Sequence, residues 1–293
     1  MLRSALLVSG MMVSSLGLAS ILPPNDLHLE DNVSKVSDLT EEEFFEITNR
    51  VIDFYKPIVA SHGATLSVNA DWPNSTVNAS AGQSGSSWYV NMYGGLARRP
   101  EVTRDGYLLV ICHELGHHLG GFPFTSGWAA NEGQSDYFAT HVCAPNIWRN
   151  DLEENARYRE LVDPVAKEQC DTSWETEEQQ NLCYRSAMAG YSLGSLLGAL
   201  RNTTVAFDTP DTSVVTRTNN RHPEAQCRLD TYVAGAMCGA SFDDEVIPGK
   251  RFRDRSGLEA ENEAYDYSCS RRDQHSDLST RRLCWYAPRV AGQ

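Results

Sequence analysis

The sequence predicts an α+β fold that is mainly helical and contains a small β-sheet. Several segments, among them residues 152–200, repeat apolar residues at helical spacing. Residues 64–96 are instead polar and rich in Gly and Ser, and they alternate in places, which is typical of short strands. The chain of 293 residues contains 8 cysteines, an even number that favours disulfides in an exported protein. We therefore expect a disulfide-stabilised, mainly helical domain.

The first residues, 1–20, are typical of a signal peptide. Arg3 supplies a positive charge, residues 5–18 are mostly apolar, and the small residues Ala19 and Ser20 follow as a cleavage point. A membrane anchor is the alternative, but Ser and Gly interrupt the apolar run, which is shorter than the roughly 20 residues of a spanning helix. We therefore expect a secreted or periplasmic protein without a stable membrane anchor.

The folded domain is predicted to begin near residue 40. Residues 21–39 carry Pro, Asp and Asn without a helical period, which indicates a linker. Thr40 and Glu43 then form a capping box that begins an amphipathic helix. In the small sheet that follows, a strand at residues 88–93 would lie beside the next helix and could bind an extended peptide along its edge.

Residues 113–117 read His-Glu-Leu-Gly-His, the H-E-x-x-H spacing of a zinc site with its general base. On a helix, residues i and i+4 lie about 40° apart around the axis, so His113 and His117 can both direct a ring nitrogen at one ion. Glu114 lies close enough to reach a water molecule at the metal without binding the ion. Gly120 ends this helix just after the second histidine.

A catalytic zinc ion takes three protein ligands and keeps a position for water, so a third ligand is required. Glu132 and Asp136 have the i, i+4 spacing that places both carboxylates on one helical face. Glu132 has the longer reach and stands first, which leaves Asp136 to accept a hydrogen bond from the second ring nitrogen of a ligand histidine. For this reason we assign Glu132 as the third metal ligand. The helix is expected to run to about Cys143 and to stop at Pro145.

These two motifs resemble those of the gluzincin zinc metallopeptidases. The signature of the metzincin class continues to a third histidine where this chain has Pro123, and proline cannot bind zinc. Residues 131–136, Asn-Glu-Gly-Gln-Ser-Asp, are similar to the N-E-x-x-S-D motif of thermolysin-like peptidases.

Two flanking motifs resemble the M48 family of zinc endopeptidases. A predicted strand and turn end in Gly95-Leu96 before the zinc helix, and His222-Pro223 is followed by Arg228. The resemblance covers roughly residues 65–240. It implies a mainly helical, zincin-like metallopeptidase domain, Zn²⁺ as cofactor, and a protein or peptide as substrate.

The same resemblance implies a catalytic role for His222, since a hydrogen-bond donor near the developing oxyanion assists peptide hydrolysis. The alternative is a histidine without a catalytic role that begins a helix running on through Tyr232 and Ala236. His118 lies about 100° from His117 on an ideal helix and is expected to be a neighbour of the site. The other histidines show no ligand spacing and are expected at the surface or in structural positions: His28, His62, His141 and His275.

All 8 cysteines follow the leader, and no C-x-x-C pair suggests a structural zinc site among them. The shortest loops favour the pairs Cys170–Cys183 and Cys269–Cys284. Cys112 lies on the apolar side of the zinc helix and is either a disulfide partner or a buried thiol. The net charge of -14 argues against nucleic acid or an anionic membrane as a partner, since both require positive patches.

We interpret residues 40–245 as one zinc metallopeptidase domain and residues 246–293 as a polar C-terminal extension. The expected function is that of an exported zinc-dependent endopeptidase with Glu114 as general base. The alternative is a catalytically inactive, exported zinc-binding module. Glu114 disfavours the module, because a purely structural zinc takes four protein ligands.

Overall fold

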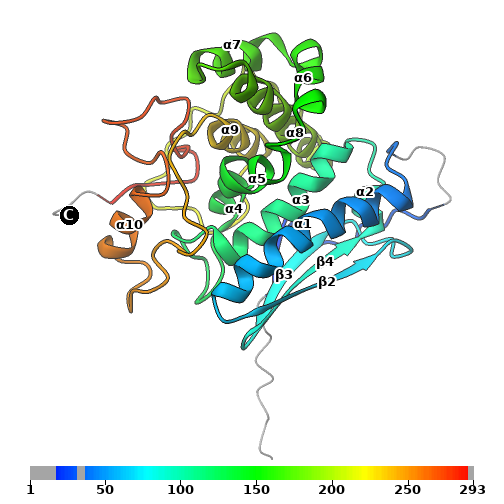
Figure 1. Ribbon diagram of the computed structural model, residues 1–293, viewed down its shortest axis with the longest axis horizontal. Coiled ribbons are helices and arrows are strands. Elements are labelled where there is room, and N and C mark those ends of the chain that lie inside the picture. Colours follow the sequence, from blue (N-terminus) through cyan, green and yellow to red (C-terminus); the bar gives the residue numbers. More distant parts are fainter. Residues whose placement is uncertain (1–17, 32–36, 290–293) are drawn as a thin grey trace, which may run out of the picture.

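The computed structural model describes residues 18–31 and 37–289. A layer of helices covers one face of a β-sheet that has four strands within the described residues (Figure 1). The predicted α+β, mainly helical fold with disulfides is therefore confirmed. The elements are β1 Ala19–Ser20, α1 Glu41–Ser61, β2 Thr65–Asp71, β3 Ala79–Ser84, β4 Ser87–Tyr93, α2 Gly94–Ala97, α3 Arg104–Leu119, α4 Glu132–Phe138, the π-helix η1 Ala139–Cys143, α5 Ala144–Trp148, α6 Leu152–Leu161, α7 Pro164–Ser173, α8 Glu177–Leu200, α9 Ala225–Ala236 and α10 Leu258–Tyr265.

The sheet has the strand order β1-β3-β4-β2. The pairs β1·β3 and β3·β4 are antiparallel, whereas β2 and β4 are parallel. Gly85 has a positive φ of 62° in the tight turn between β3 and β4, a conformation that favours glycine. The expectation that residues 88–93 form a peptide-binding edge is wrong, because β4 has a partner on each side. The short segment β1 pairs instead with β3, on the side away from β4.

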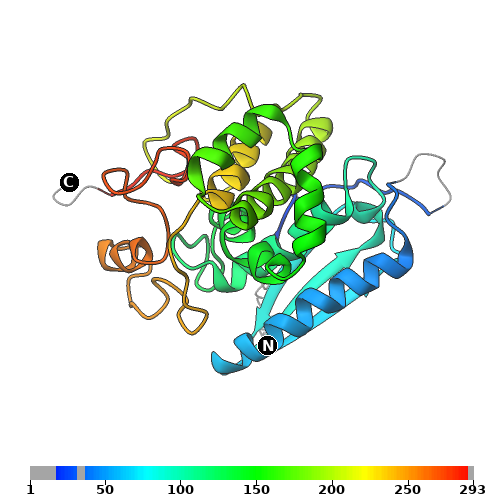
Figure 2. The same ribbon diagram turned by 45° about the horizontal axis from the view of Figure 1, so that its top comes forward.

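Helix α1 packs along the sheet, as Figure 2 shows from a second angle. The predicted capping box is confirmed, since the Thr40 hydroxyl accepts from the Glu43 amide and the Glu43 carboxylate accepts from the Thr40 amide. On its buried face, Phe44 stacks on Tyr107 of α3 with 5.0 Å between ring centroids, and the Thr48 and Tyr107 hydroxyls are 2.7 Å apart. These contacts fix α3 between the sheet and the remaining helices.

The helix that begins at Glu132 does not stop at Pro145. It passes through the π-helical turn η1 and continues as α5. At the end of η1, the Ala144 amide donates to the carbonyl of Ala139, five residues back, and Pro145 then occupies the first turn of α5, where its missing N–H costs nothing. The π-turn thus allows the chain to pass the proline without a break.

Helix α8 packs against both α3 and α9, as its Gly- and Ala-rich sequence predicts. Its backbone approaches α9 closely, since a Cβ atom at Gly190 would lie 2.6 Å from the Cβ of Tyr232. A larger residue at that position would push the two helices apart.

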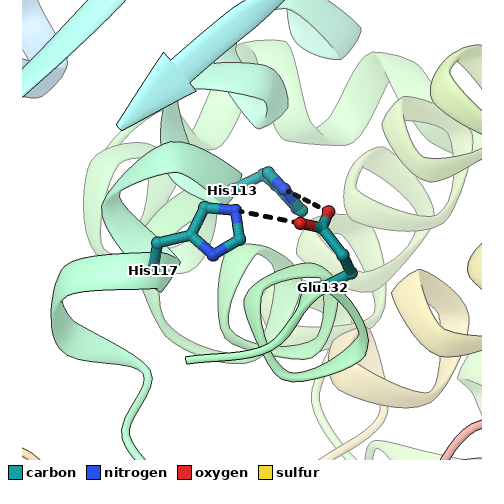
Figure 3. Close-up of side chains that lie close together, drawn as sticks. All are labelled: His113, His117 and Glu132. Atoms are coloured by element: carbon teal, nitrogen blue, oxygen red, sulfur yellow. Dashed lines mark ion pairs between the residues drawn. The ribbon is translucent and has the colours of Figure 1, made fainter. Parts of the chain in front are cut away.

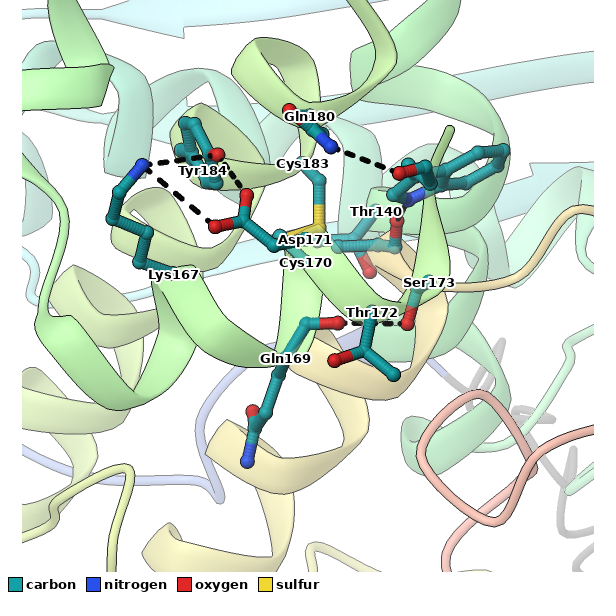
Figure 4. The surroundings of a disulfide bond; sticks show 12 residues. Thr140, Lys167, Gln169, Cys170, Asp171, Thr172, Ser173, Gln180, Cys183 and Tyr184 are labelled. Carbon is teal, nitrogen blue, oxygen red and sulfur yellow. Dashed lines mark hydrogen bonds and ion pairs between the residues drawn. A yellow bond between two sulfur atoms is a disulfide. The ribbon is translucent and has the colours of Figure 1, made fainter. Parts of the chain in front are cut away.

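All eight cysteines form disulfides. The predicted Cys170–Cys183 bond is confirmed and joins α7 to α8 (Figure 4). The expected pair Cys269–Cys284 is wrong. Cys284 bonds to a cysteine of α9, and Cys269 bonds to a cysteine of the turn that follows α9. Cys112 is a disulfide partner rather than a thiol. The remaining bonds are Cys112–Cys143, Cys227–Cys284 and Cys238–Cys269.

The C-terminal region beyond residue 246 is anchored to the helical layer. Besides its two disulfides, it contributes the fully buried Trp285, whose indole N–H donates to the Thr231 hydroxyl of α9 over 2.9 Å. The Ser279 carbonyl accepts from the Tyr137 hydroxyl of α4 over 2.7 Å. This region therefore supports the outer side of α4.

The predicted signal peptide lies outside the described residues as far as residue 17, and its last residues form β1. At the start of the expected linker, Ile21 and Leu22 are buried in the main hydrophobic core. Within 18–31 and 37–289, none of the helices combines the length and the apolar character needed to cross a bilayer. The four disulfides are typical of a protein that folds in an oxidising compartment outside the cytoplasm.

The Cys112–Cys143 bond is expected to stabilise the protein and to hold the two helices of the candidate site together. It links α3 to η1 across 31 residues of sequence, so the double variant Cys112→Ala/Cys143→Ala should lose about 2–4 kcal/mol of unfolding free energy. Denaturant titration would measure the loss. The matched control is Cys170→Ala/Cys183→Ala, whose bond joins α7 to α8 and involves neither of the helices that carry the candidate ligands. Both variants should be less stable, but only the first should also bind metal more weakly. Equal metal affinity in the two would contradict this role.

Candidate metal centre

Helix α3 places His113, Glu114 and His117 inside the protein. The helix begins at the N-cap Thr103, whose hydroxyl accepts from the Gly106 amide over 3.0 Å. All three functional side chains are fully buried. The helix therefore presents its polar motif to the protein interior rather than to a solvated face.

Helix α4 brings Glu132 to the same place. Its N-cap Asn131 accepts from the Gln134 amide over 2.9 Å, so Glu132 is the first residue of the helix. The two helices can approach because residue 116 is glycine: a Cβ there would lie 2.8 Å from the Cα of Ser135. This close contact sets the distance between the histidines and the glutamate.

The three side chains point toward one another from the two helices (Figure 3). The Glu132 carboxylate lies 3.3 Å from Nε2 of His113 and 3.6 Å from Nε2 of His117. One ligand atom from each residue lies within 4.8 Å of the others. This group contains the three predicted ligands, and Asp136 is not part of it.

The donor atoms of this group fit a metal ion. Nε2 of His113, Nε2 of His117 and Oε2 of Glu132 are buried and have no hydrogen-bond partner. Buried polar atoms are normally paired, because leaving one unpaired costs about 1–3 kcal/mol. Three such atoms that face one another are explained if they share a cation. The group could therefore hold a metal ion, and two imidazoles with one carboxylate suit a divalent transition metal.

The other nitrogen of each histidine is held by a specific acceptor. Nδ1 of His113 lies 2.8 Å from the Asp136 carboxylate, and Nδ1 of His117 lies 2.8 Å from the carbonyl oxygen of Ala130. Both acceptors favour a proton on Nδ1, which leaves Nε2 of each ring as the atom that can bind a metal ion. The structure thus places Asp136 beside His113, where the sequence predicted that a carboxylate would orient a ligand histidine.

Asp136 is itself held by Arg228 of α9. The guanidinium donates to both carboxylate oxygens, over 2.6 Å from Nε and 2.7 Å from Nη2, and both side chains are fully buried. Burial opposes ionisation of Asp136, but Arg228 and His113 outweigh it and hold the pKa of the carboxyl well below its usual range. The carboxylate therefore stays ionised and available to His113.

Glu114 and His222 are two further titratable residues near the candidate metal ligands. Burial raises the pKa of Glu114 to about 8 in the metal-free protein, and its Oε2 atom has no hydrogen-bond partner. Nε2 of His222 lies 3.6 Å from Oε2 of Glu132, and burial lowers the pKa of this imidazole. His222 precedes α9, which begins only at Ala225, so it lies outside the helix that it was expected to begin.

The sequence did not identify every residue of the site. Arg228 stood in the His-Pro motif, but nothing indicated that it would pair with Asp136. The contacts of Ser20 and Ile21 with the site were not expected either, because those residues were assigned to the leader and the linker. Ile21 donates its amide proton to Oε1 of Glu114 over 3.0 Å, and the Ser20 carbonyl lies 2.8 Å from Nε2 of His222.

His118 is a neighbour of the site and not one of the three metal-facing residues. Its ring stacks between Trp88 and Trp128, with centroid distances of 5.2 and 5.1 Å. Burial lowers its pKa to about 3, so it remains neutral. Outside this stack, His141 lies 2.8 Å from the carbonyl oxygen of Ala240, in a structural position.

Comparison of the chain with models of protein families, with curated proteins and with solved structures found no match. The geometry itself is compatible with a zincin-like site: H-E-x-x-H on one helix, a glutamate from the next, and an α+β domain around them.

We expect Glu132 and Asp136 to differ in what their loss does to metal retention. Glu132→Ala removes an inferred ligand and should leave almost no metal after dialysis. Asp136→Ala should weaken metal affinity roughly 10- to 100-fold, and it should also destabilise the fold by about 3–5 kcal/mol, since it leaves Arg228 buried without its partner. Elemental analysis and denaturant titration would measure these effects. Complete loss of metal in Asp136→Ala with retention in Glu132→Ala would reverse the assignment.

Proposed function

We propose that this protein is an exported, zinc-dependent endopeptidase, secreted or periplasmic, that hydrolyses peptide bonds in proteins or peptides. The observation that carries the proposal is the pairing of a three-ligand centre with a carboxylate next to it. Two neutral imidazoles and one carboxylate are a common ligand set of catalytic zinc. A bound zinc ion would polarise the substrate carbonyl and lower the pKa of water toward neutrality.

Glu114 is suited to move a proton between water and the leaving amine. It lies next to His113 in sequence and has one free carboxylate oxygen. A pKa near neutrality lets one group act first as base and then as acid, and burial raises the pKa of Glu114 in that direction. A backbone amide already contacts its other oxygen, at the position where a leaving nitrogen would need a proton.

His222 is suited to stabilise negative charge on the substrate oxygen. Its Nε2 atom already lies 2.8 Å from a backbone carbonyl oxygen, the distance expected for a donor to an oxyanion. An extended substrate can pair with β3, since the neighbouring segment β1 does so. Pairing of this kind recognises the backbone of a substrate in general, and contacts with its side chains would set the sequence preference.

A catalytically inactive zinc-binding module is the alternative. A purely structural zinc takes four protein ligands and closes the site. Here three residues converge, and the neighbouring carboxylate of Glu114 instead accepts a hydrogen bond from a backbone amide. Stoichiometric zinc without cleavage of casein, under conditions where the protein is folded, would favour the module.

The variant Glu114→Gln tests the mechanism. The amide cannot take a proton from water, so we expect cleavage of casein to fall by roughly 10²- to 10⁴-fold, while zinc content stays at one ion per chain. Peptide release and elemental analysis would measure the two. The matched control is Glu153→Gln, which makes the same chemical change on the exposed side of α6 and should retain full activity. A Glu114→Gln protein as active as this control would contradict the proposal.

His222→Ala separates a catalytic role from a purely structural one. Loss of an oxyanion donor should lower kcat by roughly 10²- to 10³-fold with a smaller change in KM, because the bond forms mainly in the transition state. A histidine that only precedes α9 would instead change stability and leave kcat as it was. Steady-state kinetics on a fluorogenic peptide, together with a thermal unfolding curve, would show which of the two occurs.

A further inference from the structure

Residues 19–22 of the chain lie in the candidate site as an extended segment. Ala19 and Ser20 form β1, which pairs antiparallel with β3 in the register Ala19↔Ala81 and Ser20↔Ser80. Ile21 and Leu22 follow and are almost fully buried, at 0% and 1% exposure. The segment therefore occupies the sheet edge that would be used by an extended substrate.

The peptide bond between Ser20 and Ile21 contacts both residues proposed to act in hydrolysis. Its N–H donates to Oε1 of Glu114 over 3.0 Å, and its carbonyl oxygen lies 2.8 Å from Nε2 of His222. A leaving nitrogen needs the proton carrier beside it, and a carbonyl under attack needs a donor at its oxygen. This one bond has both.

The residues on the amine side of the bond are held as well. The carbonyl of Ile21 accepts from Nη1 of Arg228 over 2.5 Å. The amide of Leu22 donates to Oδ1 of Asn78 over 3.2 Å, and the Asn78 side-chain amide lies 3.4 Å from the Leu22 carbonyl. Backbone contacts on both sides of a bond fix its position and orientation relative to the reacting groups, and such positioning favours reaction.

From this geometry we propose that the protein cleaves its own chain between Ser20 and Ile21, an inference that rests on the proposed function. Water adds its oxygen to the carbonyl carbon of Ser20, and the C–N bond to Ile21 breaks. The proton that Glu114 takes from water passes to the nitrogen of Ile21. One product ends in the carboxylate of Ser20 and the other begins with the amine of Ile21.

The burial of Ile21 indicates which side chain the site prefers directly after the cleaved bond. A fully buried β-branched side chain directly after the cleaved bond indicates a pocket for a large aliphatic residue at that position. A charged residue there would have to be desolvated without a partner, which is costly.

The test uses the full chain made by translation under oxidising conditions, without membranes and therefore without signal peptidase, in the presence of a chelator. After purification, Zn²⁺ is added and the intact mass and N-terminal sequence are followed over time, with casein cleavage measured in parallel. We expect a product that begins with Ile21, formed at a rate independent of protein concentration. Glu114→Gln should stay uncut.

Two further variants test the position of the cut. Ile21→Asp should abolish cleavage after Ser20. Its control, Leu27→Asp, changes an exposed leucine that lies beyond this segment in the sequence, and this variant should be cut as the unchanged chain is. In metal-free Glu114→Gln, hydrogen exchange should find the amides of Ile21 and Leu22 protected relative to that of Asp26, which tests the position of the segment without any catalysis.

The outcomes separate the two proposals. A chain that cleaves casein but leaves the Ser20–Ile21 bond intact overturns self-cleavage and leaves the endopeptidase standing. A cut at another bond, a cut that also occurs in Glu114→Gln, a rate that rises with protein concentration, or unprotected amides at Ile21 and Leu22 also overturns it. A folded, zinc-loaded chain that cleaves neither casein nor itself overturns both.

Discussion

The Asp136 carboxylate is the interaction on which the rest of the site depends. It accepts from Nδ1 of His113 and from two nitrogens of Arg228, so one buried anion joins α3, α4 and α9. Through Arg228 the same network reaches the carbonyl of Ile21. A buried ion pair adds little stability compared with apolar residues of similar volume, but removing one partner destabilises the fold because the remaining charge is buried without a partner. This explains why the ligand histidine, the supporting helix and the bound segment hold their positions together.

Some of the site could be predicted because helical geometry is local. The H-E-x-x-H spacing places His113 and His117 on one side of any regular helix, and Glu132 and Asp136 share a face for the same reason. The capping box at Thr40 and the short-loop disulfide Cys170–Cys183 are also local features. In each case the partners lie within a few turns of one another, so their relation does not depend on the tertiary fold.

The remaining features depend on contacts between distant parts of the chain. The pairing of Arg228 with Asp136 spans 92 residues and that of Ile21 with Glu114 spans 93, and no local period relates them. Short-loop pairing failed for Cys269 because the turn after α9 brings Cys238 closer in space. The prediction that β4 is an edge strand was wrong because β2 pairs with it in parallel, on the side opposite β3. The residues of β4 alone do not indicate this pairing.

The proposed function requires that His113, His117 and Glu132 hold one zinc ion in an open site. Anomalous diffraction at the zinc absorption edge, from crystals of the Zn²⁺-loaded Glu114→Gln protein, tests it most directly. We expect one strong peak between α3 and α4, about 2.0–2.2 Å from the two Nε2 atoms and the Glu132 carboxylate, with a fourth position not filled by a protein side chain. A peak elsewhere, a fourth side-chain ligand that closes the site, or no peak in a fully folded protein would contradict it.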